Sequence, residues 1–196
     1  DTSEPVSQGT LRIVKVFWGL SASLAYKRHF PAIDWLQSYS LYHDKIDDYF
    51  SKHVASDWTE LVGKTMQVLQ EESELEEIVR LVGVDALGYK DRLTLECARS
   101  IREDFLHQDA FHEVDTYTSP EKQHGMLSTI LTWYQKGLDA LDADVPFSRV
   151  AGMKILEQIG RMKYISEADF PQRLAEIRSQ LDAEYIALTE GGSLDA

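Results

Sequence analysis

The sequence contains a single cysteine, Cys97, which excludes an intramolecular disulfide bond. A reducing compartment is the simplest setting for such a chain. Cys97 lies within a helical pattern, where a free cysteine packs as a small hydrophobic residue, so we interpret it as structural rather than nucleophilic. Stability must come from a hydrophobic core, and 196 residues with 43% hydrophobic side chains can supply one.

Basic residues are scarce, with 20 Lys and Arg against 33 Asp and Glu and a formal net charge of -13. Because binding to phosphate backbones requires a basic stripe, this composition argues against nucleic acid as a partner. No apolar run approaches the roughly 20 residues that cross a bilayer, and the first residues lack the regions of a signal peptide. We therefore predict no direct membrane insertion.

The first fifty residues differ in composition from the rest. Residues 1–10 are polar and are expected to form a connection, and the missing initiator methionine indicates a piece of a longer protein. β-branched and aromatic residues over Arg12–Leu20 predict a strand, and residues 21–29 predict a short helix. Pro31 ends that helix and biases Phe30 away from the α region. These signals are typical of the edge of an α/β domain.

From Ser56 nearly to the end, hydrophobic residues recur at helical spacing. Caps and breakers predict a helix that begins at Ser56, and a second that begins at the Ser73–Glu76 capping box and ends before Gly83. A third helix is expected from about Lys90 to His107, and a fourth from Ser119-Pro120 through Leu141. The last two are expected after Val145-Pro146 through Met162, and from about Phe170 to Leu188, before Gly191-Gly192. Five or six antiparallel helices with short connections form a bundle. The predicted fold class is mainly α, with this bundle preceded by a short α/β tail.

Two short motifs look like chemical sites, but their spacing fails. The string GKT at 63–65 matches the end of a phosphate-binding loop, but Trp58 stands where that motif needs its first glycine. Thr116 likewise replaces the second histidine of an HExxH zinc motif that would begin at His112. We predict no catalytic residue and no metal site in the chain.

Charged and aromatic clusters leave two interpretations open. Five glutamates within Glu71–Glu77 are typical of a solvated helix face, with a docking face for a basic partner as the alternative.

Phe30 stands at a corner before Pro31, and Phe111 stands in an irregular stretch between two helices. Aromatic rings on loops can stack on a planar base, which contributes about 1–3 kcal/mol per base. On periodicity alone, packing of both rings into the core is the alternative.

The strings VFWGL, RHFPAIDW and SYSLY, within residues 4–42, resemble the end of the nucleotide-binding domain in catalytic A (alpha) chains of archaeal A-type and vacuolar-type ATPases. The likeness continues through residues 69–117 and so covers most of the chain; the β subunit of F-type ATP synthases is more distantly similar. The resemblance implies the C-terminal part of a catalytic subunit in a rotary, ion-translocating motor. The tail of the nucleotide-binding domain would span residues 1–50, and the helical bundle residues 51–196.

The resemblance also implies an adenine pocket. In that family two aromatic residues enclose the adenine ring, and the matching positions here are Phe30, with Pro31 fixing its corner, and Phe111. The intact subunit would bind ATP or ADP with Mg²⁺ and make or hydrolyse ATP. This chain has no phosphate loop, so by itself we expect it to be inactive and to bind no nucleotide tightly.

A second implied site is a loop that contacts the rotating shaft. It matches Asp85–Arg92, with contacts expected at Asp85, Ala86, Leu87, Gly88, Tyr89 and Lys90. The corresponding F-type loop is densely acidic and this one is nearly neutral, which favours contact by shape over contact by charge. The implied partners are the non-catalytic B subunits of an alternating ring and the central-shaft subunits, in the cytoplasm at the membrane periphery. The alternative is a free-standing helical interaction module that binds no nucleotide.

Overall fold

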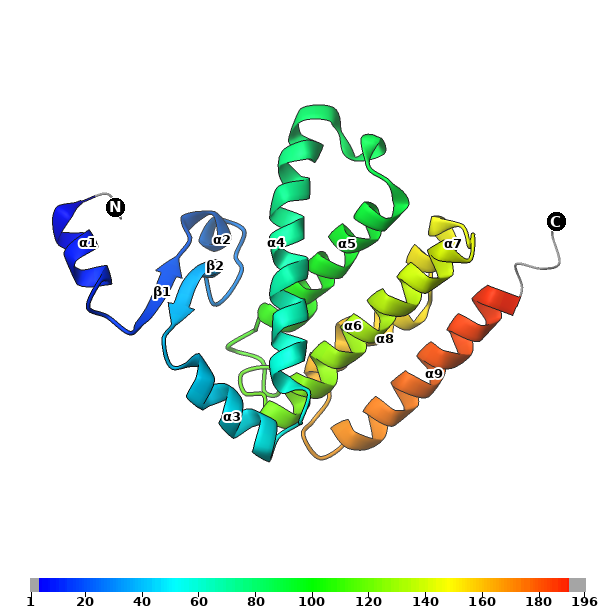
Figure 1. The fold of residues 1–196 in the computed structure, drawn as a ribbon. Helices are drawn as coiled ribbons and strands as arrows, with labels where there is room; N and C mark the ends of the chain where they lie inside the picture. Colours follow the sequence, from blue (N-terminus) through cyan, green and yellow to red (C-terminus); the bar gives the residue numbers. More distant parts are fainter. Residues whose placement is uncertain (1–3, 191–196) are drawn as a thin grey trace.

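The computed structural model describes residues 4–190 and contains two regions of different structure. A small antiparallel sheet lies on one side of the 25-residue helix α4, and the other long helices of the bundle lie on its opposite side (Figure 1). The predicted fold class, mainly α with a short α/β tail before a helical bundle, is confirmed.

The N-terminal region begins with a helix that the sequence pattern does not predict. α1 (Pro5–Leu11) occupies most of the stretch expected to be a connection, and residues 1–3 lie outside the described part. Pro5 suits the first helical position, because its φ is already helical and its missing N–H has no partner there anyway. The Tyr39 hydroxyl donates to the Leu11 carbonyl at 3.0 Å, which ties the end of this helix to the sheet.

The sheet consists of β1 (Val16–Leu20) and β2 (Ile33–Ser40), joined through the short helix α2 (Ala22–Tyr26). The predicted helix is confirmed, with the Ser21 side chain at its N-cap. The predicted strand forms over its second half only, and the sequence pattern does not predict β2. Pairing shifts register between Phe17 and Gly19, which bends the ribbon.

The next helices lead into the bundle. α3 (His43–His53), which the sequence pattern does not predict, is followed by α4 (Trp58–Val82). The pattern predicts two helices where α4 is continuous. The helix start predicted from the capping box at Ser73–Glu76 is therefore wrong, because no glycine or proline ends the helix before it. The N-cap is Asp57 rather than Ser56, whereas the stop at Gly83 is confirmed by its φ of 85°.

The remaining elements are the 3-10 turn η1 (Val84–Ala86), α5 (Tyr89–Ser100), the π-helix η2 (Ile101–Leu106), α6 (Pro120–Asp142), α7 (Phe147–Ala151), α8 (Ile155–Arg161), the 3-10 turn η3 (Met162–Tyr164) and α9 (Phe170–Glu190). The start at Ser119-Pro120 is confirmed: the Ser119 hydroxyl accepts from the Lys122 amide. The pattern predicts one helix after Val145-Pro146, but the chain turns tightly at Gly152 and divides it. The expected stop at Gly191-Gly192 lies outside the described residues.

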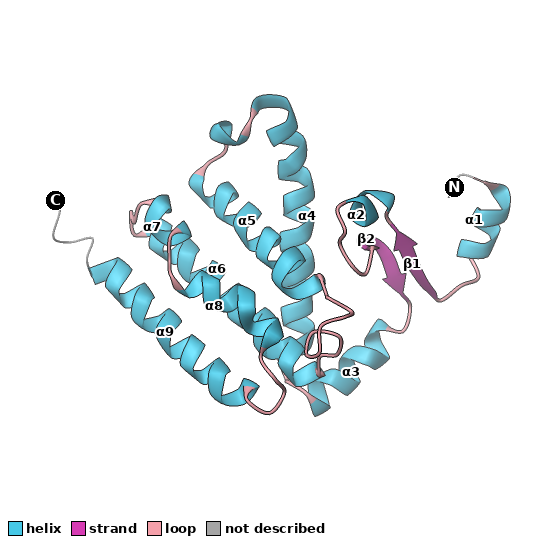
Figure 2. Cartoon of the chain, turned by 180° about the vertical axis from the view of Figure 1, so that it is seen from behind, coloured by secondary structure: helices cyan, strands magenta, loops and turns pink. Residues whose placement is uncertain are grey.

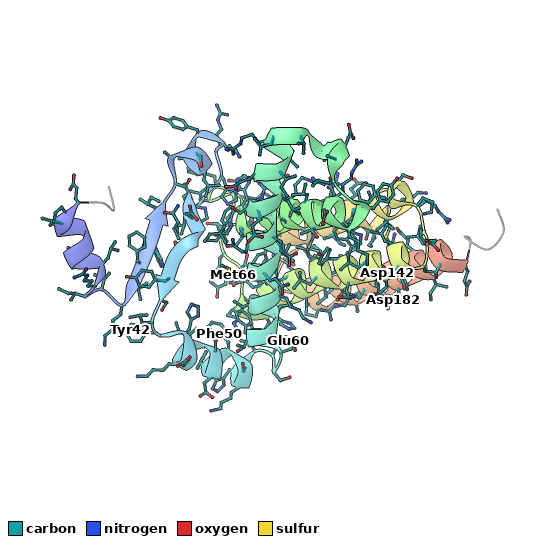
Figure 3. All side chains as sticks on the ribbon, turned by 45° about the horizontal axis from the view of Figure 1, so that its top comes forward. Tyr42, Phe50, Glu60, Met66, Asp142 and Asp182 are labelled. Carbon is teal, nitrogen blue, oxygen red and sulfur yellow. The ribbon has the colours of Figure 1, made fainter. Side chains whose placement is uncertain are left out.

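The hydrophobic core is built around α6. Fully buried side chains of α6 itself, Ile130 and Trp133, meet those of the surrounding helices there, among them Leu93, Cys97, Ile159 and Ile177. The structural role predicted for Cys97 is confirmed, and burial raises the pKa of its thiol. α9 is also tied to α6 by an ion pair between Lys136 and Asp182, at 3.1 Å (Figure 3).

The glutamate run on α4 is only partly a solvated face. Glu74, Glu76 and Glu77 are exposed, as predicted, but Glu72 is 6% exposed. Its Oε1 lies 2.9 Å from Nη2 of Arg102 in η2. A buried carboxylate needs such a partner, because burial without one is costly. Glu72 therefore attaches α4 to the π-helix.

Two buried lysines hold the ends of the short helical turns. Lys122 of α6 donates from Nζ to the carbonyls of Lys163 and Ile165, at 2.9 and 2.6 Å. Lys163 in turn donates to the carbonyls of Glu103 and His107, at 2.9 and 3.0 Å. Carbonyls at the end of a helix have no partner within the helix, and a cation there is favourable. This series of bonds connects the core to the stretch that follows η2.

We predict that Gly125→Ala destabilises the protein by about 1–3 kcal/mol through overpacking. A Cβ at Gly125 would meet Phe170 Cε1 at 2.7 Å and Leu174 Cδ2 at 2.8 Å. The matched control is Gly63→Ala on α4, where a Cβ meets nothing within 4 Å and helix propensity should stabilise the chain by about 0.5–1 kcal/mol. Urea unfolding of both variants measures the difference, and equal effects would contradict the packing described around α6.

We also predict that Lys163→Met lowers the free energy of unfolding by about 1–3 kcal/mol, because two carbonyls lose their donor. The amide of Gln108, one residue beyond His107, should then exchange its hydrogen faster. Lys154→Met, at an exposed lysine just before α8, is the control and should change neither quantity. Unchanged exchange at Gln108 in Lys163→Met would show that Lys163 does not organise this stretch.

Candidate functional site

The corner that carries Phe30 is a closed turn between α2 and β2. Arg28 has a φ of 58°, in the left-handed region that non-glycine residues rarely adopt, and the Phe30-Pro31 peptide bond is cis. The Ser21 amide donates to the Ala32 carbonyl at 2.9 Å and closes the base of the turn. The Phe30 ring is 53% exposed, so the corner presents it to solvent.

The irregular stretch between η2 and α6 is organised by its own side chains. Asp115, buried at 1% exposure, accepts from the Asp109 amide at 2.7 Å. The His112 ring accepts from the amides of Val114 and Asp115, and Asp109 accepts from the Phe111 amide at 3.0 Å. The Phe111 ring is fully exposed. An ordered backbone therefore presents an aromatic side chain to solvent.

These two stretches, far apart in the sequence, are joined directly. The Gln108 amide donates to the Phe30 carbonyl at 2.7 Å, and the rings of His29 and His107 lie 5.1 Å apart between centroids. The loops between η2 and α6 lie on the side of the bundle that faces the strands (Figure 2). Phe30 and Phe111 are thus both exposed on linked turns, and neither packs into the core.

An apolar groove of about 240 Å³ lies between the sheet and the bundle, close to this junction. Trp35 of β2 and Met66 of α4 line it, together with Phe105 and Trp58. Met66 lies on the side of α4 toward the strands (Figure 3). Phe50 of α3 stacks on Trp58 with centroids 4.4 Å apart. Aromatic packing therefore attaches the N-terminal region to the bundle.

The loop expected to contact a shaft lies at the end of α4 remote from α3 (Figure 1). Several of its residues make contacts within the chain: Leu87 is buried, Tyr89 stacks on Phe147 at 5.9 Å, and Lys90 pairs with Asp142 at 2.5 Å (Figure 3). Arg92 lies 3.4 Å from Asp85 and also donates to the Leu87 carbonyl.

The tip also exposes apolar side chains, most of which the sequence prediction does not include. Leu81 is 83% exposed, and Val82, Val84 and Tyr89 are also exposed. Only Tyr89 is among the predicted contacts. The available signal is a pair of apolar residues on the last helical turn directly before Gly83. Several exposed apolar side chains close together in the sequence at a helix end make this tip a candidate interaction site.

Other candidate chemistry is limited within the described residues. The string GKT at 63–65 lies inside α4, where its amides are engaged in helical hydrogen bonds and cannot surround a phosphate group. Among residues 4–190, no group of three or more His, Cys, Asp or Glu side chains could hold a metal ion. Over the same range, we find no helix with both the length and the hydrophobicity to cross a membrane.

Comparison with family models divides the chain into two matches. Residues 47–150 match the C-terminal domain of V and A type ATP synthase. Residues 1–40 match the nucleotide-binding domain of the ATP synthase alpha/beta family. The sheet and the corner with Phe30 therefore lie in the second match, and both Phe111 and the loop expected to contact a shaft lie in the first.

Individual relatives agree with these matches. The V-type ATP synthase alpha chain of Thermoanaerobacter pseudethanolicus is 56% identical over all 196 residues, and that of Acetivibrio thermocellus is 58% identical over 188 residues, 96% of this chain. The V-type ATP synthase alpha chain of Clostridioides difficile is 56% identical, also over 188 residues. The chain spans about a third of the length of these relatives, 32–33%.

A solved structure supports the fold. The ATP synthase subunit NeqB from Nanoarcheaum equitans covers 68% of this chain with a TM-score of 0.57, and the match spans 31% of that protein at 24% identity. The alternative of a free-standing helical module is not favoured, because the relatives match the sheet and the bundle together. From the family match over residues 47–150 and relatives that are more than half identical, we conclude that the chain belongs to the alpha-chain family of V- and A-type ATP synthases.

Proposed function

We propose that this chain is the C-terminal part of the catalytic subunit of a rotary V/A-type ATP synthase, where it supplies aromatic side chains of the adenine pocket and a surface that contacts the central shaft. The observation that carries the proposal is the 2.7 Å hydrogen bond from Gln108 to the Phe30 carbonyl. It joins two turns that each present an exposed aromatic ring.

The chemistry of these turns suits a planar, uncharged ring. Phe30 and Phe111 offer apolar faces, and stacking on them contributes about 1–3 kcal/mol per base. Two such contacts do not offset the roughly 4–15 kcal/mol of translational and rotational freedom lost on binding. Tight binding of ATP or ADP with Mg²⁺ therefore needs a phosphate loop, which this chain does not contain. We expect the chain by itself to be inactive and to hold no nucleotide tightly.

We divide the chain at residue 50, with the tail of the nucleotide-binding domain before it and the helical bundle after it. The limits of the two family matches, residue 40 and residue 47, support this division. In the assembled motor, the partners would be non-catalytic B subunits in an alternating ring and the central-shaft subunits. The assembly would place this chain in the cytoplasmic sector, peripheral to the membrane.

The proposed shaft contact is the apolar tip formed by Leu81, Val82, Val84 and Tyr89, together with the predicted Asp85–Lys90 loop. The four apolar side chains of the tip are exposed and uncharged, which supports contact by shape. Asp85 and Lys90 are already paired with Arg92 and Asp142, so charge contributes less. Burying exposed apolar area of this kind provides roughly 25 cal/mol per Å².

We predict that Phe30→Ala and Phe111→Ala each weaken ADP binding to the complete subunit by roughly 5- to 150-fold, which corresponds to one stacking contact. Because both rings are exposed, the free energy of unfolding should change little. Tyr26→Ala, on α2 and 89% exposed, is the control and should leave affinity unchanged. Equilibrium titration with ADP measures the effect.

Two outcomes would contradict this proposal. Unchanged ADP affinity in both phenylalanine variants would remove the adenine pocket from these turns. A loss of affinity accompanied by an equal loss of stability would indicate that the rings support the fold instead.

We predict that Leu81→Gln and Val82→Gln together weaken binding of the subunit ring to purified shaft subunits by about tenfold or more. Glutamine retains helix propensity, so folding should persist. Ile186→Gln is the matched control, because Ile186 is an apolar residue of α9 that is 50% exposed and lies away from the tip. Equal affinity of the tip variant and the control would refute a contact at the tip.

A further inference from the structure

We propose that His29 and His107 form a positioning pair, which holds the Phe30 corner against the stretch that carries Phe111 only while the His29 imidazole is neutral. Adenine-nucleotide binding would then weaken on mild acidification. The inference rests on the proposed adenine pocket and adds to it a residue pair and a pH dependence. Neither histidine would touch the nucleotide; they would act through the position of Phe30.

The geometry places this pair beside the hydrogen bond that joins the two turns. The His29 and His107 rings are tilted by 32° with centroids 5.1 Å apart, and His29 also packs 5.6 Å from Trp35. His29 directly precedes Phe30, and His107 directly precedes Gln108, the donor to the Phe30 carbonyl. Two adjacent cross-links therefore join the turns, one made by the backbone and one by the rings.

Each histidine stands on a backbone that is held in place. The His107 amide donates to the Arg102 carbonyl at 2.9 Å, and its carbonyl accepts from buried Lys163 at 3.0 Å. On the other side, the His29 amide donates to the Leu24 carbonyl at 2.9 Å, which closes the turn after α2. With both backbones held, repulsion between a protonated His29 and its neighbours has to be relieved by separating the turns or by turning the ring away.

The charged groups around His29 disfavour its protonation. His107 and Arg102 come from the η2 side, and Lys163 comes from η3; Glu103, also on η2, acts in the opposite direction. The Arg102 charge is already shared with Glu72 of α4, as described above. Burial lowers the pKa of His29 most, and the neighbouring His107, Arg102 and Lys163 lower it further.

The sign of the pH effect follows from this. When the turns separate, the pKa of His29 returns toward about 6.5, so the open form binds protons more readily than the closed form. The closed arrangement is therefore fully favoured above about pH 6.5 and loses stability as the pH falls from there toward the lower pKa of the closed form. Nucleotide affinity should decline over the same range.

The first test needs no nucleotide. In the complete subunit labelled at histidine carbons, His29 should titrate below about pH 6.5 by NMR, and its midpoint should rise in His107→Phe, which keeps a ring but removes the second imidazole. His43→Gln, at an exposed histidine of α3, is the control and should leave the His29 midpoint unchanged. A His29 midpoint at the ordinary histidine value, or one that is equal in His107→Phe and the control, would overturn the pair.

The second test measures ADP affinity at about pH 7.5 and about pH 5.5, on either side of the ordinary histidine pKa. The affinity of the wild type should fall more than that of His107→Phe, and comparing the two proteins cancels protonation of the nucleotide itself. Equal falls, with His29 titrating as expected, would show that the pair is structural and does not position Phe30. If Phe30→Ala and Phe111→Ala both leave affinity unchanged, the adenine pocket fails instead, while the histidine titration still decides whether the pair exists.

Discussion

Close packing around α6 is the constraint on which the rest of the structure depends. Gly125 and Gly137 leave no side chain on two faces of this helix, so the Phe170 ring and the Leu93 side chain approach its backbone. Interiors packed this densely do not deform gradually, and the neighbouring helices have one close arrangement. The positions of α5, α9 and the turns attached to them follow from that arrangement.

The exposed site inherits its geometry from this core through a short series of hydrogen bonds. Lys122 of α6 holds η3, Lys163 of η3 holds the His107 carbonyl at the end of η2, and the next residue, Gln108, holds the Phe30 corner. Burying two lysines is costly, and burial does lower the pKa of Lys122. Each lysine donates to two carbonyls, and ordering this stretch offsets the cost of burial.

Local signals in the sequence predict the local structure well. Ser119-Pro120 and Gly83 mark real helix ends, and hydrophobic spacing locates α5, α6 and α9. The prediction fails at Ser73, where the capping-box pattern occurs but no glycine or proline ends the helix before it. The sequence also does not indicate that the charged side chain of Lys163 is buried. Phe30 and Phe111 are singled out by a resemblance, but the contact between His29 and His107 has no sequence signal. Pairings between residues this far apart depend on the packed fold.

One continuous helical segment connects the apolar tip to the junction of the two turns. The 12 residues of α5 run directly into the 6 of η2, so Tyr89 stands at one end and the stretch leading to Gln108 at the other, roughly 25 Å away. Under the proposed function, force applied by a shaft at the tip reaches the nucleotide through this segment. Coupling between sites is reciprocal and amounts to about 1–3 kcal/mol in typical proteins. One hydrogen bond and one ring contact have a combined strength of this order, so the junction at Phe30 can transmit the coupling and can also be broken by it.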